Sequence, residues 1–379
     1  MSAVAVREIA GRWWTPAGFV DGVCRHDTHV LAFEHGSPVS GIEARGDDAP
    51  SSSSPVFLPA PVDLHVHGGG GHDCMGGDAA LRGMLRAHAE HGTGAMLATS
   101  VTAPFAEIDR FVESVARVMA SPEAGEATLL GAHLEGPFIN PGKLGAQPPH
   151  AASPDAGRLA AWLDSGVVRA LTLAPEIDED GALLDLCRRR GVSVQIGHTL
   201  CSWAEARRAF DAGCGVTHLY NAMSGVSHRG GGAATAALAY AGYAEIITDG
   251  LHVERAAFDA ARRAIPGLYS VTDATAAAGM PDGAYRLGPL SVEKRDERVL
   301  LPDGTLAGSC LTQRASFAVL RGWGLGWHDV AALSSAVPAR WLDDVTVGRT
   351  APGAHAHWIE LRGDEPVASW LGGRRRAWR

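Results

Sequence analysis

The chain has 379 residues, of which 46% are hydrophobic and 20% charged, and 33 basic against 42 acidic residues give it a formal net charge of −9. This composition is that of a globular protein large enough to bury a core without cross-links. The acidic balance argues against a general nucleic-acid-binding or membrane-surface protein, because such a protein presents a basic face.

The sequence also bears on the compartment in which the protein works. No apolar run approaches the roughly 20 residues that span a bilayer. The N-terminus lacks the basic-then-apolar layout of a signal peptide. Six cysteines are present and none forms a CxxC pair, so we expect reduced thiols. These observations predict a cytoplasmic protein with neither a membrane nor a nucleic acid as partner.

In chain order, short strand-like stretches lie between Val4 and Glu34, and Gly46–Pro55 has the composition of a loop. Apolar segments of strand length then alternate with helical ones. Strands are predicted at Val62–His67, Gly94–Thr99, Thr128–Glu135, Val167–Leu173, Val192–Gly197, Gly215–Leu219, Tyr243–Thr248 and Leu268–Asp273. Helices are predicted at Ala80–His91, Ala106–Met119, Ser202–Ala212 and Arg255–Ile265, among others. Eight strands that alternate with helices predict an α/β fold, a (β/α)₈ barrel of the TIM type.

The tail of the chain, from Asp344 onward, has a strand-like pattern again. We expect the two chain ends to meet in a small β-sandwich beside the barrel. The predicted domains are therefore residues 1–55 plus 344–379 for the sandwich and residues 56–343 for the barrel.

Polar residues occur repeatedly where the predicted strands end. Functional groups of barrel enzymes gather at the C-terminal ends of the strands, and alternate residues of a strand share a face. His65 and His67 should therefore point together into the barrel mouth. One histidine at such a place is more often structural than a ligand, but packing does not explain a whole set. The other members of the set are Glu135, His198, His218 and Asp273. Imidazole and carboxylate groups around an open position predict a catalytic divalent metal.

The same segments resemble the amidohydrolase superfamily and, within it, the N-acetylglucosamine-6-phosphate deacetylase family. The resemblance runs from about Leu58 to Leu342. It rests on PAPVDLHVHGGGGHDCM, GAHLEGPFINPGKLGAQPPH, IGHT, VTHLYNAM, ITDGLHV, VTDATAAAGMPDGAYRLG and TLAGSCLT. It implies metal-dependent hydrolysis of the acetamide of N-acetylglucosamine 6-phosphate, which yields acetate and glucosamine 6-phosphate in amino-sugar catabolism.

The resemblance also implies roles for individual residues. Glu135, His198 and His218 would hold the main metal, His65 and His67 would support a second, and Asp273 would carry the proton. The ion would be zinc, with iron or another divalent ion as alternatives, at one or two per chain. Residues that match substrate contacts are Asn221, Ala222, Arg229, His252, Leu306, Ala307, Gly308 and Ser309. Arg229 matches a phosphate-binding arginine that can reach across a dimer interface, so we expect a homodimer or a larger homo-oligomer.

Two positions depart from the pattern of the family. A histidine that polarises the amide carbonyl often follows the glutamate by twelve residues, and here that position is Gln147, which we expect to assist in catalysis. The usual HREPG segment reads HRGGG, which keeps Arg229 but leaves open whether the substrate must be phosphorylated. The glycine run Gly68–Gly71 lacks the lysine of a P-loop, so we expect it to permit close backbone approach beside the metal site.

Two alternatives remain open at this point. The chain could act on another N-acyl amino sugar or a related amide. Cyclic-amide relatives generally bridge two metals with a carboxylated lysine, whereas Glu135 supplies a carboxylate directly. A remote alternative is a non-catalytic barrel that serves as an interaction protein, although such proteins usually lose the ligands that this chain keeps.

Overall fold

Strands from both ends of the chain form one seven-stranded sheet. The computed structural model describes residues 5–35 and 54–378, so the predicted loop Gly46–Pro55 lies outside it except for its last two residues. The strands are β1 (Arg7–Thr15), β2 (Gly18–His26), β3 (Val30–His35), β4 (Val56–Pro59), β18 (Trp358–Arg362), β19 (Glu365–Leu371) and β20 (Arg374–Ala377). Their order is β20-β19-β18-β4-β1-β2-β3.

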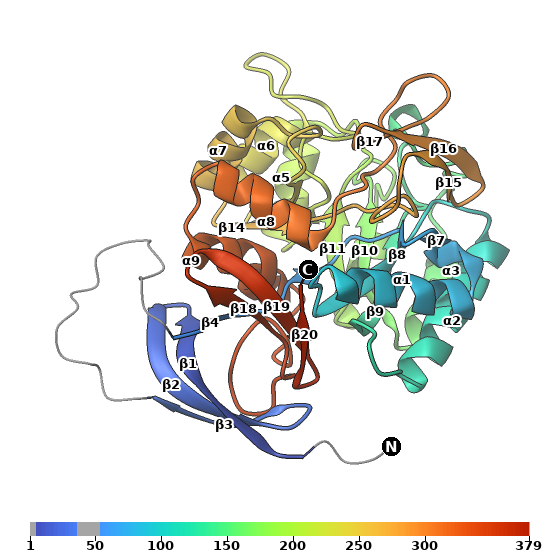
Figure 1. The fold of residues 1–379 in the computed structure, drawn as a ribbon. Coiled ribbons are helices and arrows are strands. Elements are labelled where there is room, and N and C mark those ends of the chain that lie inside the picture. Colours follow the sequence, from blue (N-terminus) through green and yellow to red (C-terminus); the bar gives the residue numbers. More distant parts are fainter. Residues whose placement is uncertain (1–4, 36–53, 379) are drawn as a thin grey trace.

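Aromatic packing joins the two chain ends within this sheet. The Trp13 ring stacks on Phe57 with 4.3 Å between ring centroids, and it meets the Trp358 ring edge-on at 5.1 Å. Figure 1 shows the blue strands β1–β3 and the red strands β18–β20 together on one side of the molecule, away from most of the helices. The division into residues 1–55 plus 344–379 and residues 56–343 stays a prediction, and β4 belongs to the chain-end sheet by its hydrogen bonds.

Eight parallel strands form the barrel, one for each predicted strand. Six lie in one sheet in the order β12-β11-β10-β9-β8-β5, and the other two pair with each other. Their bounds are β5 (Val62–Asp63), β8 (Ala95–Ser100), β9 (Thr128–Glu135), β10 (Val168–Leu173), β11 (Ser193–Ile196), β12 (Gly215–Val216), β13 (Tyr243–Ile247) and β14 (Gly267–Val271).

Backbone hydrogen bonds just beyond the short strands close the ring. Leu219 N donates to Glu245 O at 2.9 Å, which joins the end of β12 to β13. Asp273 N donates to His65 O at 2.9 Å, which joins the end of β14 to β5. The predicted (β/α)₈ barrel with a small β-sandwich domain from both chain ends is thus confirmed as a barrel with a separate sheet domain, in which the chain ends form one seven-stranded sheet.

Helices surround the barrel, and polar caps fix where several of them begin. Ser202 and Glu205 form a reciprocal capping box at the start of α5, and Thr312 caps α8. The helices are α1 (Asp78–Glu90), α2 (Phe105–Ala120), α3 (Ala156–Asp164), α4 (Ala182–Arg189), α5 (Trp203–Asp211), α6 (Ala233–Tyr240), α7 (Arg255–Ala264), α8 (Gln313–Gly322), α9 (Trp327–Ala331) and α10 (Val337–Trp341), with a π-helical turn at Ala332–Ala336 and 3₁₀ turns at Cys74–Gly76 and Pro141–Lys143. Within the described ranges, no helix has the length and apolarity needed to cross a membrane.

A small antiparallel sheet that the sequence patterns did not predict follows the last barrel strand. It consists of β15 (Gly283–Leu287), β16 (Leu290–Arg295) and β17 (Arg298–Leu300), while β6 (Gly68–Gly69) and β7 (His72–Asp73) form a separate hairpin after β5. Leu287, Val292 and Val299 pack against Ala307 in a separate apolar cluster. This sheet therefore contributes to the wall above the carboxyl ends of the barrel strands (Figure 1).

Candidate active site

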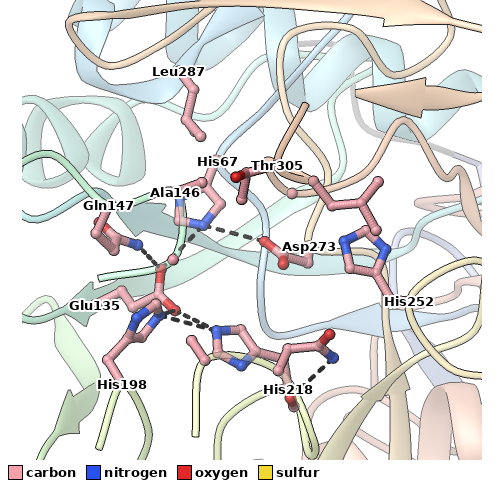
Figure 2. A pocket seen from close by; sticks show the side chains of 15 residues that line it. His67, Glu135, Ala146, Gln147, His198, His218, His252, Asp273, Leu287 and Thr305 are labelled. Carbon is pink, nitrogen blue, oxygen red and sulfur yellow. Dashed lines mark hydrogen bonds and ion pairs between the residues drawn. The ribbon is translucent and has the colours of Figure 1, made fainter. Parts of the chain in front are cut away.

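A cavity of about 250 Å³ opens at the carboxyl ends of the barrel strands. It is lined by five of the six residues predicted from the strand ends, namely His67, Glu135, His198, His218 and Asp273. His65 is fully buried directly behind them. Figure 2 shows His198 and His218 beside one oxygen of the Glu135 carboxylate and Gln147 and His67 beside the other, with Asp273 next to His67.

Three of these side chains belong to residues whose own backbone takes a left-handed conformation. The φ angles are 49° at His198, 28° at His218 and 50° at Asp273. Residues with a side chain seldom adopt such angles, and they concentrate at functional sites where surrounding contacts hold them. Asn221 N donates to His218 O at 3.0 Å, and Ser309 N donates to Asp273 O at 2.8 Å. The first bond closes a tight turn after His218, and the second holds the Asp273 backbone against the segment around Ser309.

One cluster of the site centres on Glu135. Its Oε1 lies 3.0 Å from Nε2 of His198 and 3.0 Å from Nε2 of His218. All three side chains are buried, and their candidate ligand atoms lie within 4.8 Å of one another. The three residues expected to hold the main metal are therefore adjacent in the structure.

A second cluster lies against the first and shares Glu135 with it. Asp273 Oδ1 lies 3.5 Å from His65 Nε2 and 3.3 Å from His67 Nε2. Glu135 Oε2 lies 3.2 Å from His67 Nε2. Glu135 Oε1 also lies 3.5 Å from His65 Nε2. The Glu135 carboxylate therefore contacts histidines of both clusters.

Hydrogen bonds to backbone carbonyls outside the clusters fix the orientation of two of the imidazole rings. His67 Nδ1 lies 2.9 Å from the carbonyl of Thr99, and His198 Nδ1 lies 2.9 Å from that of Lys143. A carbonyl oxygen only accepts, so each Nδ1 carries a proton and each neutral ring leaves its Nε2 lone pair for the centre. Such outer contacts are those that orient metal-binding histidines.

The pair His65 and His67 shows why a cation fits here. His65 Nδ1 lies 2.9 Å from a carboxylate oxygen of Glu245, so His65 too carries its proton on Nδ1. The Nε2 atoms of His65 and His67 are 3.2 Å apart. With neutral rings, two lone pairs face each other at that distance and repel, unless a cation lies between them. Histidine and carboxylate donors without thiolate suit zinc, iron and related divalent ions.

Buried carboxylates dominate the charge of the site. Burial by itself raises the pKa of Glu135 and of Asp273, but the charges and hydrogen bonds of nearby histidines outweigh it and hold both pKa values below their ordinary range. Burial lowers the pKa of His67, whereas hydrogen bonds with Asp273 and Glu135 raise it to about 9. Both carboxylates remain ionised. The space between them and the Nε2 atoms of the histidines therefore favours a positively charged group.

Gln147 contacts the centre through Glu135. Its side-chain amide donates to Glu135 Oε2, and its carbonyl oxygen accepts the backbone N–H of Thr102 at 2.6 Å. Gln147 also lines the cavity. The structure therefore places this residue where it can orient the shared carboxylate as well as reach a bound substrate.

The residues expected to contact substrate divide into two groups. Asn221, Ala222, His252, Leu306 and Gly308 line the cavity. Three others do not line it, namely Ala307, Ser309 and Arg229. Ala307 is buried in the apolar cluster of the small sheet, the Ser309 hydroxyl donates to Thr272 O at 2.6 Å, and Arg229 lies exposed on the loop between β12 and α6.

Several residues of the site were missed by the sequence interpretation, among them Gly145 and Ala146 of the cavity lining. Leu287 and Thr305 line the cavity from the small sheet and from the loop that follows it. Asp249 Oδ2 lies 2.6 Å from His252 Nδ1 and holds that ring. Glu245 is a charged residue inside the apolar strand β13, and this isolated charge was a signal that could have found it.

No protein-family model matches the chain, but curated relatives do. The N-acetylglucosamine-6-phosphate deacetylase of Bacillus subtilis (strain 168) is 35% identical over 320 residues, which cover 80% of this chain and 80% of the relative. The N-acetylgalactosamine-6-phosphate deacetylase of Escherichia coli O157:H7 is 34% identical over 347 residues, which cover 88% of this chain and 91% of the relative.

Solved structures agree with these relatives. A point mutant of N-acetyl-D-glucosamine-6-phosphate deacetylase from Mycobacterium smegmatis, in complex with N-acetyl-D-glucosamine-6-phosphate, superposes with a TM-score of 0.85 at 30% identity and covers 98% of this chain and 99% of that chain. The enzyme of the same name from Thermotoga maritima gives a TM-score of 0.84 at 27% identity, with 97% and 99% covered. The chain belongs to the N-acetylglucosamine-6-phosphate deacetylase family of the amidohydrolase superfamily.

Proposed function

We propose that the chain hydrolyses the acetamide of N-acetylglucosamine 6-phosphate to acetate and glucosamine 6-phosphate, as a step of amino-sugar catabolism. The observation that carries the proposal is the shared carboxylate of Glu135 between two histidine clusters at the cavity floor. Relatives of this name match most of the chain. A cytoplasmic location is part of the proposal, and it is supported by six buried cysteines that are all unpaired.

Zinc is the ion that we propose for the centre, with iron as the main alternative and one or two ions per chain. Glu135, His198 and His218 would hold one ion, and His65 and His67 a second, with Asp273 next to it. A divalent metal bound there supplies Lewis acidity, which polarises the amide carbonyl and makes water a nucleophile near neutral pH.

Asp273 is the residue that we propose to move the proton. Its carboxylate is ionised and faces the cavity beside His67, so it can take a proton from the attacking water. The same group then returns the proton to the amine that leaves, since one carboxyl group can act first as base and then as acid. Gln147 would support the oxyanion with a side-chain N–H.

Recognition of the substrate phosphate is proposed to need a second copy of the chain. Among the residues that the structure describes, no lysine or arginine lines the cavity. Arg229 is exposed, and its loop also carries the exposed side chain of Val226 (61%). Two more exposed apolar side chains, Leu200 (51%) and Trp203 (53%), lie at the start of α5, where Trp203 N donates to Gly231 O of the same loop. We propose that these residues pack in a homodimer and that Arg229 of one copy reaches the phosphate bound by the other.

N-Acetylgalactosamine 6-phosphate is the second candidate substrate, because the relative from Escherichia coli O157:H7 carries that name and matches 88% of this chain. The two sugars differ only in the orientation of one hydroxyl. Acetate release should be measured with both phosphorylated sugars and with unphosphorylated N-acetylglucosamine. The proposal requires the highest kcat/KM on N-acetylglucosamine 6-phosphate, and a preference for either of the other two would replace the substrate named here.

A further inference from the structure

Glu245 is a charged residue in the interior of the barrel, below the cavity. It lies on β13 and its relative solvent exposure is 0%. It does not line the cavity, so it cannot touch the substrate directly. A buried carboxylate is costly unless several hydrogen-bond donors satisfy it. The donors around Glu245 therefore indicate which residues it positions.

Three donors converge on the two oxygens of Glu245. Oε2 lies 2.9 Å from His65 Nδ1 and accepts the backbone N–H of His218 at 3.1 Å. Oε1 accepts the side-chain N–H of Gln195 at 2.8 Å. One oxygen therefore bonds a residue of each histidine cluster at once.

The contact with His65 decides which ring nitrogen is free. An ionised carboxylate only accepts hydrogen bonds, so the proton between the two groups lies on His65 Nδ1. The Nε2 lone pair is then directed at His67 and Asp273, whose facing atoms are 3.2 Å and 3.5 Å away. Outer carboxylates that hold a histidine in this way raise its basicity and fix its orientation toward a metal.

The contact with His218 holds a strained backbone in place. The φ angle of His218 is 28°, a conformation that persists only when neighbouring bonds enforce it. Its N–H is bonded by Glu245, and its ring projects toward Glu135, with Nε2 at 3.0 Å from Oε1. Glu245 thus acts on a ligand of the first cluster through the backbone and on one of the second through a side chain.

We propose that Glu245 is a positioning residue that orients His65 for the second metal and fixes the spacing between the two clusters. This inference rests on the proposed metal-dependent function. Replacing Glu245 should therefore weaken metal binding, whereas replacing a buried carboxylate elsewhere in the protein should not.

Glutamine at this position keeps the shape but cannot satisfy all three donors. If its carbonyl faces His65 and His218, its NH₂ group meets the NH₂ group of Gln195. Gln195 cannot turn without loss, because its carbonyl already accepts the Thr217 hydroxyl at 2.9 Å. If the new amide is reversed, its N–H faces His65 Nδ1, and the His65 proton moves to Nε2, where the metal should bind.

The test compares E245Q with E360Q, the same substitution at a remote buried carboxylate. Glu360 lies in the chain-end sheet and is 2% exposed. It accepts hydrogen bonds from Trp370 Nε1 and Arg375 Nε at 3.0 Å and 2.7 Å. Both variants should lower Tm, because both leave buried donors poorly satisfied. Only E245Q should change how metal binds.

The measurements are metal content per chain by elemental analysis and zinc affinity by competition with a chelator. Wild type and E360Q should each hold two ions, and the affinity at each site should be the same in both proteins. E245Q should keep the ion of the first cluster and bind the ion of the second about 10- to 100-fold more weakly. Wild-type affinity at both sites in folded E245Q would overturn the proposal. So would a wild type that binds only one ion, although that result leaves the proposed deacetylation intact. Two bound ions without any acetate release would instead refute the proposed function.

A second measurement does not depend on E245Q folding. Nitrogen-15 correlation spectra of the metal-free wild type, with His65 assigned from its absence in H65Q, report which ring nitrogen carries the proton. The proposal requires protonation at Nδ1 of His65. A neutral ring protonated mainly at Nε2 would overturn it.

Discussion

At the scale of single residues, Gln147 has two partners that constrain its role. It donates to Glu135 and accepts from the Thr102 backbone. A glutamine amide has two N–H groups, so we expect the one that does not bond Glu135 to donate to the oxyanion. Unlike histidine, glutamine does not titrate near neutral pH.

Replacing Gln147 by alanine should lower kcat by up to about 10²–10³, as when a donor to an oxyanion is lost. Gln147→His should stay active and gain a pH dependence between about 5 and 8, because the new ring titrates there. The measurement is kcat against pH for the three proteins. A folded alanine variant with full activity would exclude Gln147 from catalysis.

Asp249 should set the pH range in which phosphorylated substrate binds. Burial lowers the pKa of His252, but the hydrogen bond and charge of Asp249 outweigh it and raise that pKa above its ordinary value. A raised pKa keeps His252 positively charged to higher pH, so its attraction for phosphate is present below that pKa and is lost as pH rises through it.

Asp249→Asn should therefore move the rise in KM to lower pH. KM should be measured at pH 7 to 9, where a phosphate monoester with a second pKa of about 6 is fully ionised. Unphosphorylated N-acetylglucosamine serves as the control, because the pH dependence of its KM should be the same in wild type and Asp249→Asn. An unchanged pH profile in Asp249→Asn would show that His252 binds as a neutral ring.

The six strand-end residues of the centre could be predicted from the sequence, because each follows an apolar segment of strand length and alternate residues of a strand share a face. The groups that orient them could not. Two of these groups are backbone carbonyls, of Thr99 and Lys143, which any residue type supplies. Glu245 and Asp249 act through charged side chains, which a sequence does show. Their partners could not be predicted, because those of Glu245 are distant along the chain and that of Asp249 depends on the geometry of a loop.

At the scale of elements, the glycine run after β5 shows how closely the backbone packs beside the centre. A Cβ atom on Gly68 would lie 2.5 Å from Ala276 N and 2.5 Å from His72 O. Both neighbours are backbone atoms and cannot move aside cheaply. This close approach agrees with the role expected for Gly68–Gly71.

Gly68→Ala should destabilise the fold by about 1–3 kcal/mol, the usual cost of overpacking. Gly322→Ala is the matched control, because Gly322 ends helix α8 and nothing lies within 4 Å of an added Cβ. That change should be neutral or slightly stabilising. Urea unfolding of both variants measures the difference, and equal stabilities would contradict the packing argument.

All eight barrel strands could be predicted, but several are shorter in the structure. β12 ends at Val216, not Leu219, and β5 ends at Asp63, not His67. The chain turns there to present ligands, which strand patterns do not reveal. The sheet of β15–β17 was missed because its apolar residues are few and lie among charged ones, as in a loop. The predicted strand of the tail begins only at Trp358.

At the scale of the whole molecule, Arg229 is exposed and lies outside the cavity, so within the described part of one chain no arginine or lysine lies beside the substrate phosphate. Arg229→Ala should lower kcat/KM for the phosphorylated sugar by roughly tenfold to over a hundredfold, the effect of losing a hydrogen bond to a charged partner. The unphosphorylated sugar should be almost unaffected. Equal losses on both substrates would indicate a structural role for Arg229. Patterns within one chain do not reveal which residues of two copies meet.

The central claim is that metal in this centre drives the hydrolysis while Asp273 moves the proton. Chelator-treated enzyme should be titrated with zinc, and acetate release from N-acetylglucosamine 6-phosphate should be followed together with bound metal. Wild-type activity should be absent without metal and return in proportion to bound zinc. Asp273→Asn should bind zinc in the first cluster but remain about 10²–10⁴-fold slower. Full activity in metal-free enzyme, or near-normal turnover in Asp273→Asn, would contradict the account.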